Sequence, residues 1–448
     1  MVLASGSLEA PKIDVARMER DLATLGRIGR GEAEGAGLCR LAWTDAEFEA
    51  KAYVARELAG VGFSVSYDEV ANLWAELGPR DPAEGALAFG SHLDTVPNGG
   101  AYDGALGVVA ALETCRVIAM SGRPPVRPIR MVVFTDEEGA RFGTGLFGST
   151  AAAGAHDLTH LMTLRDAAGD SLENVMQRRG FRLSELPRAR ARIQDVAAYL
   201  ELHIEQGPRL ERMGLDAAVV EVITGITQVR FTFRGEANHA GTTAFADRHD
   251  ASLPAATCAL ALRRAAAASG GRAVATAGLW HVEPGAANVI PGQATLSVEV
   301  RSPDPIVLGD VLSVTERAAR EAAEREGVQM SVDVRHSVRE AQMDSAWRDR
   351  LRHALVARGV CDPPFLVSWA GHDAGALSRV LPVAMLFVPS HMGVSHAPAE
   401  YTPPESYERG VQAFCDTIGH WAWGGAFPVA PGARQVPSSP DGQGRSIR

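Results

Sequence analysis

"ALAFGSHLDTVPNGGAYDGALGVVAALETCRVIAM", residues 86–120, has the sequence pattern of a strand, a turn and a helix in succession. Residues 86–96 have the pattern of a buried strand that ends in polar residues, and a glycine-rich turn follows them. A helix with a broad apolar face is predicted to begin at Gly104. Buried strands that alternate with helices indicate an α/β sheet with helices on both faces. In such sheets, ligands bind outside the carboxyl ends of the strands.

Buried strands of this kind occur on both sides of a segment whose strands have a different hydrophobic pattern. Buried strands are predicted at 129–135, 199–207 and 382–390. Residues 227–237 and 293–302 instead alternate apolar and polar side chains, as half-buried antiparallel strands do, and alanine-rich helical stretches cover about 249–268 and 308–327. We therefore predict an α/β domain with a mixed sheet between helices (1–222 plus 337–423), an inserted α+β domain with an antiparallel sheet (223–336), and a disordered tail (424–448).

Composition excludes several classes of protein. The net charge of -10 argues against a nucleic-acid partner or an anionic membrane. No apolar stretch approaches the roughly 20 residues that span a bilayer, and the N-terminus lacks the apolar core of a signal peptide. The five cysteines are scattered and contain no CxxC pair. We expect a cytoplasmic protein with reduced thiols.

Potential metal ligands fall at the predicted carboxyl ends of these strands. Their nitrogen and oxygen atoms suit Zn²⁺, Mn²⁺, Co²⁺ or Ni²⁺. A pair of such ions would need a bridging carboxylate. The candidates are His92, Asp94, Asp103, Glu137, Glu138, His203 and His396.

Each of these residues also has an ordinary interpretation. A lone histidine at a strand end is usually structural, and Asp103 could cap the helix that begins at Gly104. Glu137 and Glu138 are adjacent like charges, which cost free energy unless a cation lies near them or one of them holds a proton. The joint pattern at the strand ends of one sheet favours a metal centre.

Six motifs resemble those of the metal-dependent amidohydrolases of the M20 peptidase clan. The resemblance is closest to the branch of N-carbamoyl-L-amino-acid hydrolases, allantoate amidohydrolases and β-ureidopropionases, and it runs from about residue 20 to 423. "ELHIEQG" (201–207) with "GGAYDG" (99–104) is specific to that branch. The motifs are 90–113, 135–149 ("TDEEGARFGTGLFGS"), 201–211, 235–243 ("GEANHAGTT"), 282–292 ("VEPGAANVIPG") and 395–402 ("SHAPAEYT").

The resemblance implies two divalent metal ions in each subunit and a role for each candidate residue. Asp103 would bridge the two ions, and Glu137 would be the general base. Asp94 would orient the imidazole of His92. The remaining ligands would be His92 and His203 for one ion, and Glu138 and His396 for the other.

The resemblance also assigns substrate roles to four residues. Arg301, which the sequence alone makes a solvent-facing strand residue, would bind the substrate carboxylate bidentately. Asn288 and Gln206 would hold the rest of the substrate. His239 would reach into the active site of the partner subunit of a homodimer and stabilise the oxyanion. The resemblance makes 1–222 plus 337–423 the catalytic domain that binds the two metal ions. The inserted domain at 223–336 would act as a lid and form the dimer interface.

The implied reaction is hydrolysis of the carbamoyl or ureido C–N bond of N-carbamoyl-L-amino acids to amino acid, ammonia and carbon dioxide by a metal-bound hydroxide. Allantoate amidohydrolase and β-ureidopropionase activity remain alternatives, and His391 is unexpected in the pocket wall. "ELHIEQG" argues against an aminopeptidase or deacylase, and Glu137 beside a full ligand set argues against a non-catalytic metal-binding protein. Nucleotide binding through "NGGAYDGALG" (98–107) is disfavoured because that stretch contains neither GxGxxG nor a P-loop lysine.

Overall fold

The computed structural model describes residues 10–79 and 85–425. Of the predicted tail at 424–448, only the first two residues belong to the described part of the chain. In the described ranges, no helix has both the length and the apolar character needed to cross a membrane.

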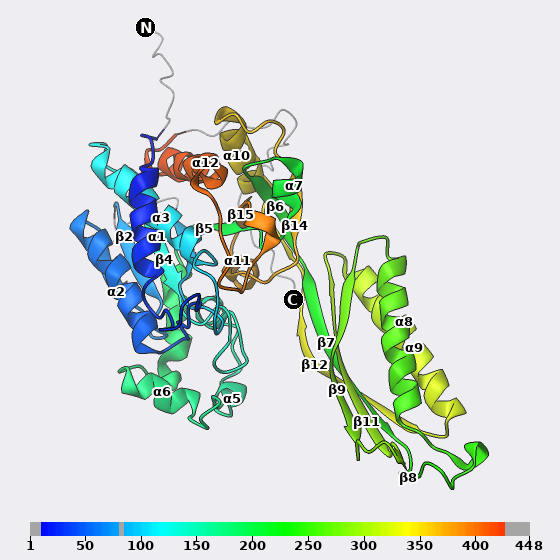
Figure 1. Ribbon diagram of the computed structural model, residues 1–448. Helices are drawn as coiled ribbons and strands as arrows, with labels where there is room; N and C mark the ends of the chain where they lie inside the picture. The colour runs from blue at the N-terminus through cyan, green and yellow to red at the C-terminus, as the bar shows by residue number, and fades with distance from the viewer. Residues whose placement is uncertain (1–9, 80–84, 426–448) are drawn as a thin grey trace, which may run out of the picture.

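The chain forms two bodies, each built on its own sheet (Figure 1). The larger body contains a nine-stranded mixed sheet with the order β1-β2-β4-β3-β5-β15-β6-β13, and β14 pairs with β6 off this path. Its strands are β1 (Ser64–Tyr67), β2 (Leu73–Leu77), β3 (Ala86–His92), β4 (Ile129–Phe134), β5 (Val196–Ile204), β6 (Ala218–Ile223), β13 (Ala341–Gln342), β14 (Phe365–Ser368) and β15 (Val383–Val388).

Helices cover both faces of this sheet, as predicted. Leu87 and Phe89 of β3 pack in a core with α1, α2, α3, α10 and α12, whereas Ala88 between them packs in a second core with α4 and α11. The helices are α1 (Val15–Leu25), α2 (Asp45–Gly60), α3 (Ala105–Met120), α4 (Phe147–Ala153), α5 (Leu158–Leu161), α6 (Leu172–Arg178), α7 (Arg209–Met213), α10 (Ser345–Ala357), α11 (Asp373–Leu377) and α12 (Pro404–Ala422), with 3-10 helices η1 (Leu183–Ile193) and η3 (His391–Gly393).

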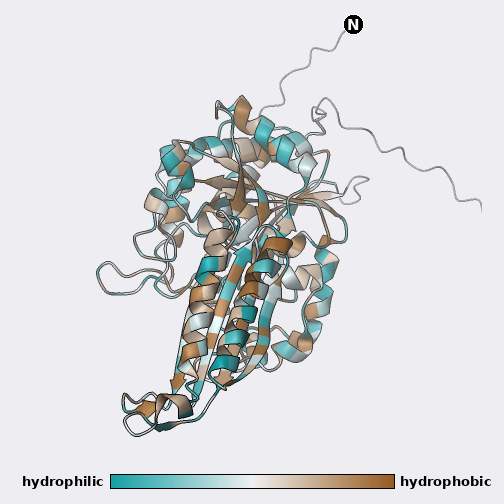
Figure 2. Ribbon diagram, turned by 90° about the vertical axis from the view of Figure 1, so that its right-hand side faces the viewer, coloured by the Kyte–Doolittle hydropathy of each residue, from teal (hydrophilic) through white to brown (hydrophobic). Residues whose placement is uncertain are grey.

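The smaller body has a four-stranded antiparallel sheet with the order β12-β7-β11-β9, and two helices cover one of its faces. Figure 2 views this body with α8 and α9 in front of the strands. It contains β7 (Gly225–Arg234), α8 (Ser252–Ala268), β9 (Val274–Glu283), β11 (Gln293–Ser302), α9 (Pro305–Arg325) and β12 (Gln329–Val338), with the short elements β8 (Asn238–His239), η2 (Phe245–Asp247) and β10 (Val289–Ile290).

The sequence explains where several of these elements begin. The Thr44 side chain accepts a hydrogen bond from the Glu47 amide at the start of α2. Asp304 accepts bonds from the first amides of α9, and Pro305 occupies its first turn, where no donor is needed. At α3 the preceding Gly104 has a φ of 62°, and a Cβ there would lie 2.5 Å from the His92 ring. Glycine therefore lets the helix begin directly against the end of β3.

The predicted fold class is confirmed at the level of a large mixed sheet with a separate antiparallel sheet. The chain leaves the large sheet between Ile223 and Gly225 and returns to it between Val338 and Ala341. The predicted limits of the inserted domain, 223 and 336, stay a prediction.

A buried ion pair anchors the end of β4, from which Glu137 and Glu138 follow. Lys51 of α2 and Glu47 are both fully buried, and Lys51 Nζ lies 2.6 Å from Glu47 Oε1. The same ammonium donates to Thr135 Oγ1 at 2.7 Å and to the Ala71 carbonyl at 3.0 Å. All three hydrogens of the ammonium are therefore used, and one of them holds the residue that follows β4.

We expect Lys51→Met to lower the free energy of unfolding by about 3–5 kcal/mol, because the Glu47 carboxylate would stay buried without its cation. Adding Glu47→Gln should restore part of this loss. Lys12→Met, at a side chain that is 79% exposed, is the matched control and should change little. Urea denaturation measures all three variants, and a loss below about 1 kcal/mol for Lys51→Met would contradict the assignment.

Candidate active site

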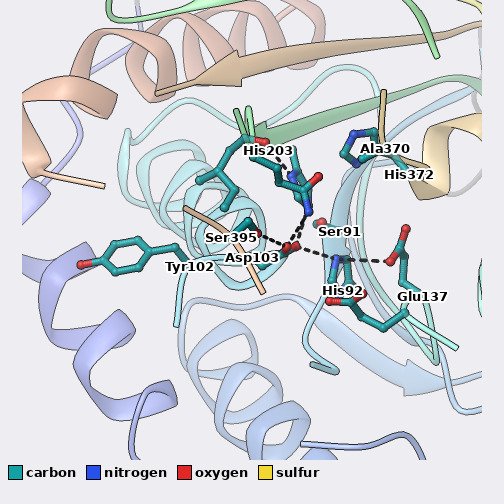
Figure 3. A network of polar contacts seen from close by, with 12 residues as sticks. Ser91, His92, Tyr102, Asp103, Glu137, His203, Ala370, His372 and Ser395 are labelled. Atoms are coloured by element: carbon teal, nitrogen blue, oxygen red, sulfur yellow. Dashed lines mark hydrogen bonds and ion pairs between the residues drawn. The ribbon is translucent and has the colours of Figure 1, made fainter. Parts of the chain in front are cut away.

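Imidazole and carboxylate groups converge at the carboxyl edge of the parallel strands β3, β4 and β5 (Figure 3). His92 is the last residue of β3, His203 lies one residue before the end of β5, and Glu137 lies three residues past β4. Asp103 precedes α3. His92 and His203 are each 1% exposed and Asp103 is 5% exposed, so the cluster is shielded from bulk water.

Asp103 lies at the centre of the cluster. Its Oδ1 is 3.2 Å from His203 Nε2 and 3.5 Å from His92 Nε2. Its Oδ2 is 3.2 Å from His396 Nε2, which in turn lies 3.4 Å from Glu138 Oε2. In the described residues there are three groups of potential metal ligands, each with its atoms within 4.8 Å of one another. Asp103 belongs to two of them, one with His92 and His203 and one with Glu138 and His396, and the third consists of Glu201, His203 and His372.

The rings of His92 and His203 are oriented so that Nδ1 faces a backbone carbonyl and Nε2 faces Asp103. The carbonyl of Asp94 lies 3.1 Å from His92 Nδ1, and the carbonyl of Ile204 lies 2.9 Å from His203 Nδ1. Because a carbonyl only accepts, each Nδ1 carries a hydrogen, and Nε2 is the nitrogen that each ring directs at Asp103 and could offer to a metal ion. His203 Nε2 is buried and makes no hydrogen bond with the described residues. Divalent cations fit this donor set, which consists of imidazole nitrogens and carboxylate oxygens.

The electrostatics of the cluster also favour a cation. Burial, with the neighbouring carboxylates of Glu138, Asp373 and Asp94, raises the pKa of Glu137 well above its usual range. Burial raises the pKa of Glu138 to about 7. The hydrogen bond with Asp103 raises the pKa of His396 to about 9. These shifts are those of an acidic site short of positive charge, where protons and metal ions compete for the same atoms.

Asp94 contacts His92 mainly through its backbone rather than through the carboxylate that was expected to orient the ring. Its Oδ1 lies 3.7 Å from His92 Nδ1, farther than its own carbonyl oxygen. The two carboxylate oxygens instead accept hydrogen bonds from the backbone amides of Glu137 and Glu138, each at 3.1 Å. Asp94 thus fixes the backbone of the glutamate pair relative to β3.

Gln206 lies against the cluster, and His391 does not. Gln206 Nε2 donates to Asp103 Oδ2 at 2.6 Å, and the residue lines a cavity of about 460 Å³ with Trp369, Ser395 and His396. His391 Nδ1 instead pairs with Glu211 Oε1 at 2.8 Å on the surface. His391 is absent from the lining of this cavity, so its unexpected presence in the sequence does not alter the wall there.

The other three predicted substrate residues belong to the smaller body. Arg301 lies at the junction of the two bodies, where its Nη1 donates to the Trp369 carbonyl at 2.6 Å and its Nε donates to Glu299 at 2.7 Å. Asn288 and His239 are exposed, and β8, which contains His239, lies at the end of the smaller body that is distant from the large sheet (Figure 1). Within one chain, the structure does not bring His239 to Asp103.

Two groups of residues beside the cluster were missed from the sequence. Glu201 accepts from Ser91 Oγ and from the Ala374 amide, each at 3.0 Å, and the His372 ring lies 4.5 Å from that of His203. Glu201 is two residues before His203 on one strand, so period-two alternation could have placed it on the same face. The second group, Ser395 and Glu400, flanks His396 in a loop and gives no periodic signal.

Comparison with known proteins supports one family over most of the chain. The model of the peptidase family M20/M25/M40 matches residues 88–420. N-carbamoyl-L-amino-acid amidohydrolase of Paenarthrobacter aurescens is 34% identical over 401 residues, which cover 90% of this chain and 96% of that protein. Allantoate amidohydrolase of Bacillus subtilis (strain 168) is 32% identical over 389 residues, covering 87% and 93% respectively.

A solved structure leads to the same family. An amidase of the hydantoinase/carbamoylase family from Burkholderia multivorans superposes with a TM-score of 0.81 at 30% identity, and the match covers 93% of this chain and 99% of that one. The matches extend over both bodies, so they concern the whole architecture and not the metal-ligand motifs alone. The chain belongs to the peptidase family M20/M25/M40.

Proposed function

We propose that the protein hydrolyses the carbamoyl or ureido C–N bond of N-carbamoyl-L-amino acids and releases amino acid, ammonia and carbon dioxide. Membership of the family makes the chain a hydrolase of amide C–N bonds. The observation that carries the proposal is the Asp103 cluster, in which each carboxylate oxygen faces a separate group of potential ligands. The similarity to allantoate amidohydrolases supports a ureide such as allantoate as the second candidate substrate.

The enzymes of this family depend on metals, and we infer two divalent ions per subunit, drawn from Zn²⁺, Mn²⁺, Co²⁺ and Ni²⁺. His92 and His203 would hold one ion and Glu138 and His396 the other, with Asp103 shared. Such ions supply a Lewis acid and lower the pKa of bound water.

Glu137 is the proposed general base. Its Oε2 lies 3.8 Å from His92 Nε2, beside the ligand groups but outside all of them. Asp94 holds its backbone amide, which fixes the start of the side chain. From this position Glu137 would take a proton from the attacking water and pass it to the leaving nitrogen.

The substrate would bind between the two bodies. Arg301 already lies at this junction and would grip the α-carboxylate, with Gln206 and Asn288 holding the remaining polar groups. Fixing the carboxylate orients the scissile bond, which contributes strongly to the rate. The smaller body would in this way act as a lid.

A homodimer formed through the smaller body would complete the site with His239 of the partner. The edge strand β9 exposes Leu279 and Trp280, and α8 exposes Leu253 and Leu260, so apolar side chains and an open strand edge lie on one body. His239 would stabilise the oxyanion across the interface. A cytoplasmic location without nucleic-acid or membrane partners remains our expectation.

An ammonia-release assay tests the proposed reaction. Metal-free protein would be reconstituted separately with each of the four ions and offered N-carbamoyl-L-amino acids, allantoate and N-carbamoyl-β-alanine in parallel. We expect ammonia from an N-carbamoyl-L-amino acid with at least one of the ions. Release from allantoate alone would select the second candidate, and no release from any substrate with any ion would contradict the proposal.

The two adjacent glutamates should respond differently to substitution. Glu137→Gln should lower kcat by roughly 10²–10⁴-fold and leave the metal content unchanged, because the base is lost and the ligands are kept. Glu138→Ala should lose one of two ions, as measured by inductively coupled plasma mass spectrometry. Glu34→Gln, at an exposed position, is the control. If Glu137→Gln stays active, Glu137 is not the general base.

Mixing two inactive variants tests the shared site. His239→Ala and Arg301→Ala should each be inactive, whereas a heterodimer of the two would contain one site with both residues intact. Random reassociation should therefore recover about a quarter of wild-type activity, since about half of the dimers are heterodimers. Heterodimers that form, as shown by differential tags, without any gain in activity would exclude a role for His239 across the interface.

A further inference from the structure

We propose that Glu400 is a positioning residue that holds the loop containing Asp103 and the loop containing His396 together. This inference rests on the proposed metal centre and adds that its second ion position, at Glu138 and His396, depends on Glu400. Glu400 touches none of the reacting atoms and would act through the two ligands on either side of it.

The first contact of Glu400 is with the backbone of the loop at 99–104. Glu400 is 4% exposed, and its Oε2 accepts hydrogen bonds from the amides of Tyr102 at 2.7 Å and Asp103 at 2.9 Å. Charge-assisted bonds of this kind are stronger than neutral ones. Glu400 therefore fixes the backbone of the residue whose carboxylate is shared by two ligand groups.

The second contact is with the loop of His396. Ser395 Oγ lies 2.8 Å from Glu400 Oε1 and 2.9 Å from Asp103 Oδ2. A hydroxyl has one hydrogen, so Ser395 donates to one of these carboxylates at a time. In either case the residue before His396 is tied to the Asp103–Glu400 pair.

Glycine makes this arrangement possible. A Cβ at Gly100 would lie 2.1 Å from Glu400 Oε2, so a side chain there would exclude the Glu400 carboxylate. Gly100, which the sequence presents only as part of a turn, therefore leaves the space that Glu400 fills.

His396 needs such support more than the other two histidines do. His92 and His203 belong to central strands, whereas His396 lies in a loop and has a φ of 55°, a left-handed conformation that side chains rarely adopt. Conformations of this kind persist only where the surroundings determine them. The hydrogen bonds of Ser395 and Glu400 hold the loop of His396 in this conformation.

We expect the hydrogen bonds of the side chain at position 400, and not its charge, to position the two loops. A glutamine at position 400 could accept both amides with its oxygen and donate to Ser395 with its nitrogen, after which Ser395 would donate to Asp103. Alanine would remove every contact. We therefore expect Glu400→Gln to retain the function and Glu400→Ala to lose it.

The test is binding of Mn²⁺ to the full chain, measured by isothermal titration calorimetry and by metal content after dialysis. Wild type should bind two ions, and Glu400→Gln should bind two within about threefold of wild-type affinity. Glu400→Ala should keep one ion and bind the second 10–100-fold more weakly, as is typical when a group that orients a ligand is removed. Glu405→Ala, at an exposed position near Glu400, should bind like wild type.

Ser395→Ala removes the hydroxyl that links the His396 loop to Asp103 and Glu400. It should therefore also weaken the binding of the second ion, and this can be measured even if Glu400→Ala fails to fold. Two ions bound with wild-type affinity by Glu400→Ala or by Ser395→Ala would overturn the inference. Wild type that binds no ion would contradict the proposed metal centre itself, and this outcome is distinct from equal binding by wild type and variants.

Discussion

The central interaction is the contact of one buried carboxylate with three imidazoles that come from distant parts of the chain. Asp103 presents one oxygen to His92 and His203 and the other to His396. These groups meet because parallel strands end at one edge of the sheet, and because Gly104 lets α3 begin directly against His92. The three histidines lower the pKa of Asp103, whereas burial and the neighbouring carboxylates raise the pKa of Glu137 and Glu138, so a cation at the site would favour the ionised form of both glutamates.

The residues around Asp103 differ in their positions and contacts. Glu138 belongs to a ligand group, and Glu137 lies beside the groups without belonging to any of them. Asp94 holds the amides of both glutamates, which gives the pair a fixed backbone and leaves their side chains to differ in function. Arg301 is in a separate body, yet it donates to the carbonyl of Trp369, a residue that lines the cavity with His396 and Gln206.

Much of this arrangement could be predicted from the sequence, because strands and their ends have periodic signals. The strand ends that bear His92 and His203, the helix after Gly104 and the shared face of Glu299 and Arg301 follow from apolar periodicity. Contacts between loops have no such signal. The bonds of Glu400 to Tyr102 and Asp103 join residues almost 300 positions apart, and they depend on the space left by Gly100.

Anomalous diffraction from crystals grown with Mn²⁺ tests most directly whether two ions share Asp103. Data would be collected on both sides of the manganese absorption edge. We expect two peaks in each subunit, both in contact with Asp103, one beside His92 and His203 and the other beside Glu138 and His396. A single peak, or peaks that do not contact Asp103, would contradict this expectation.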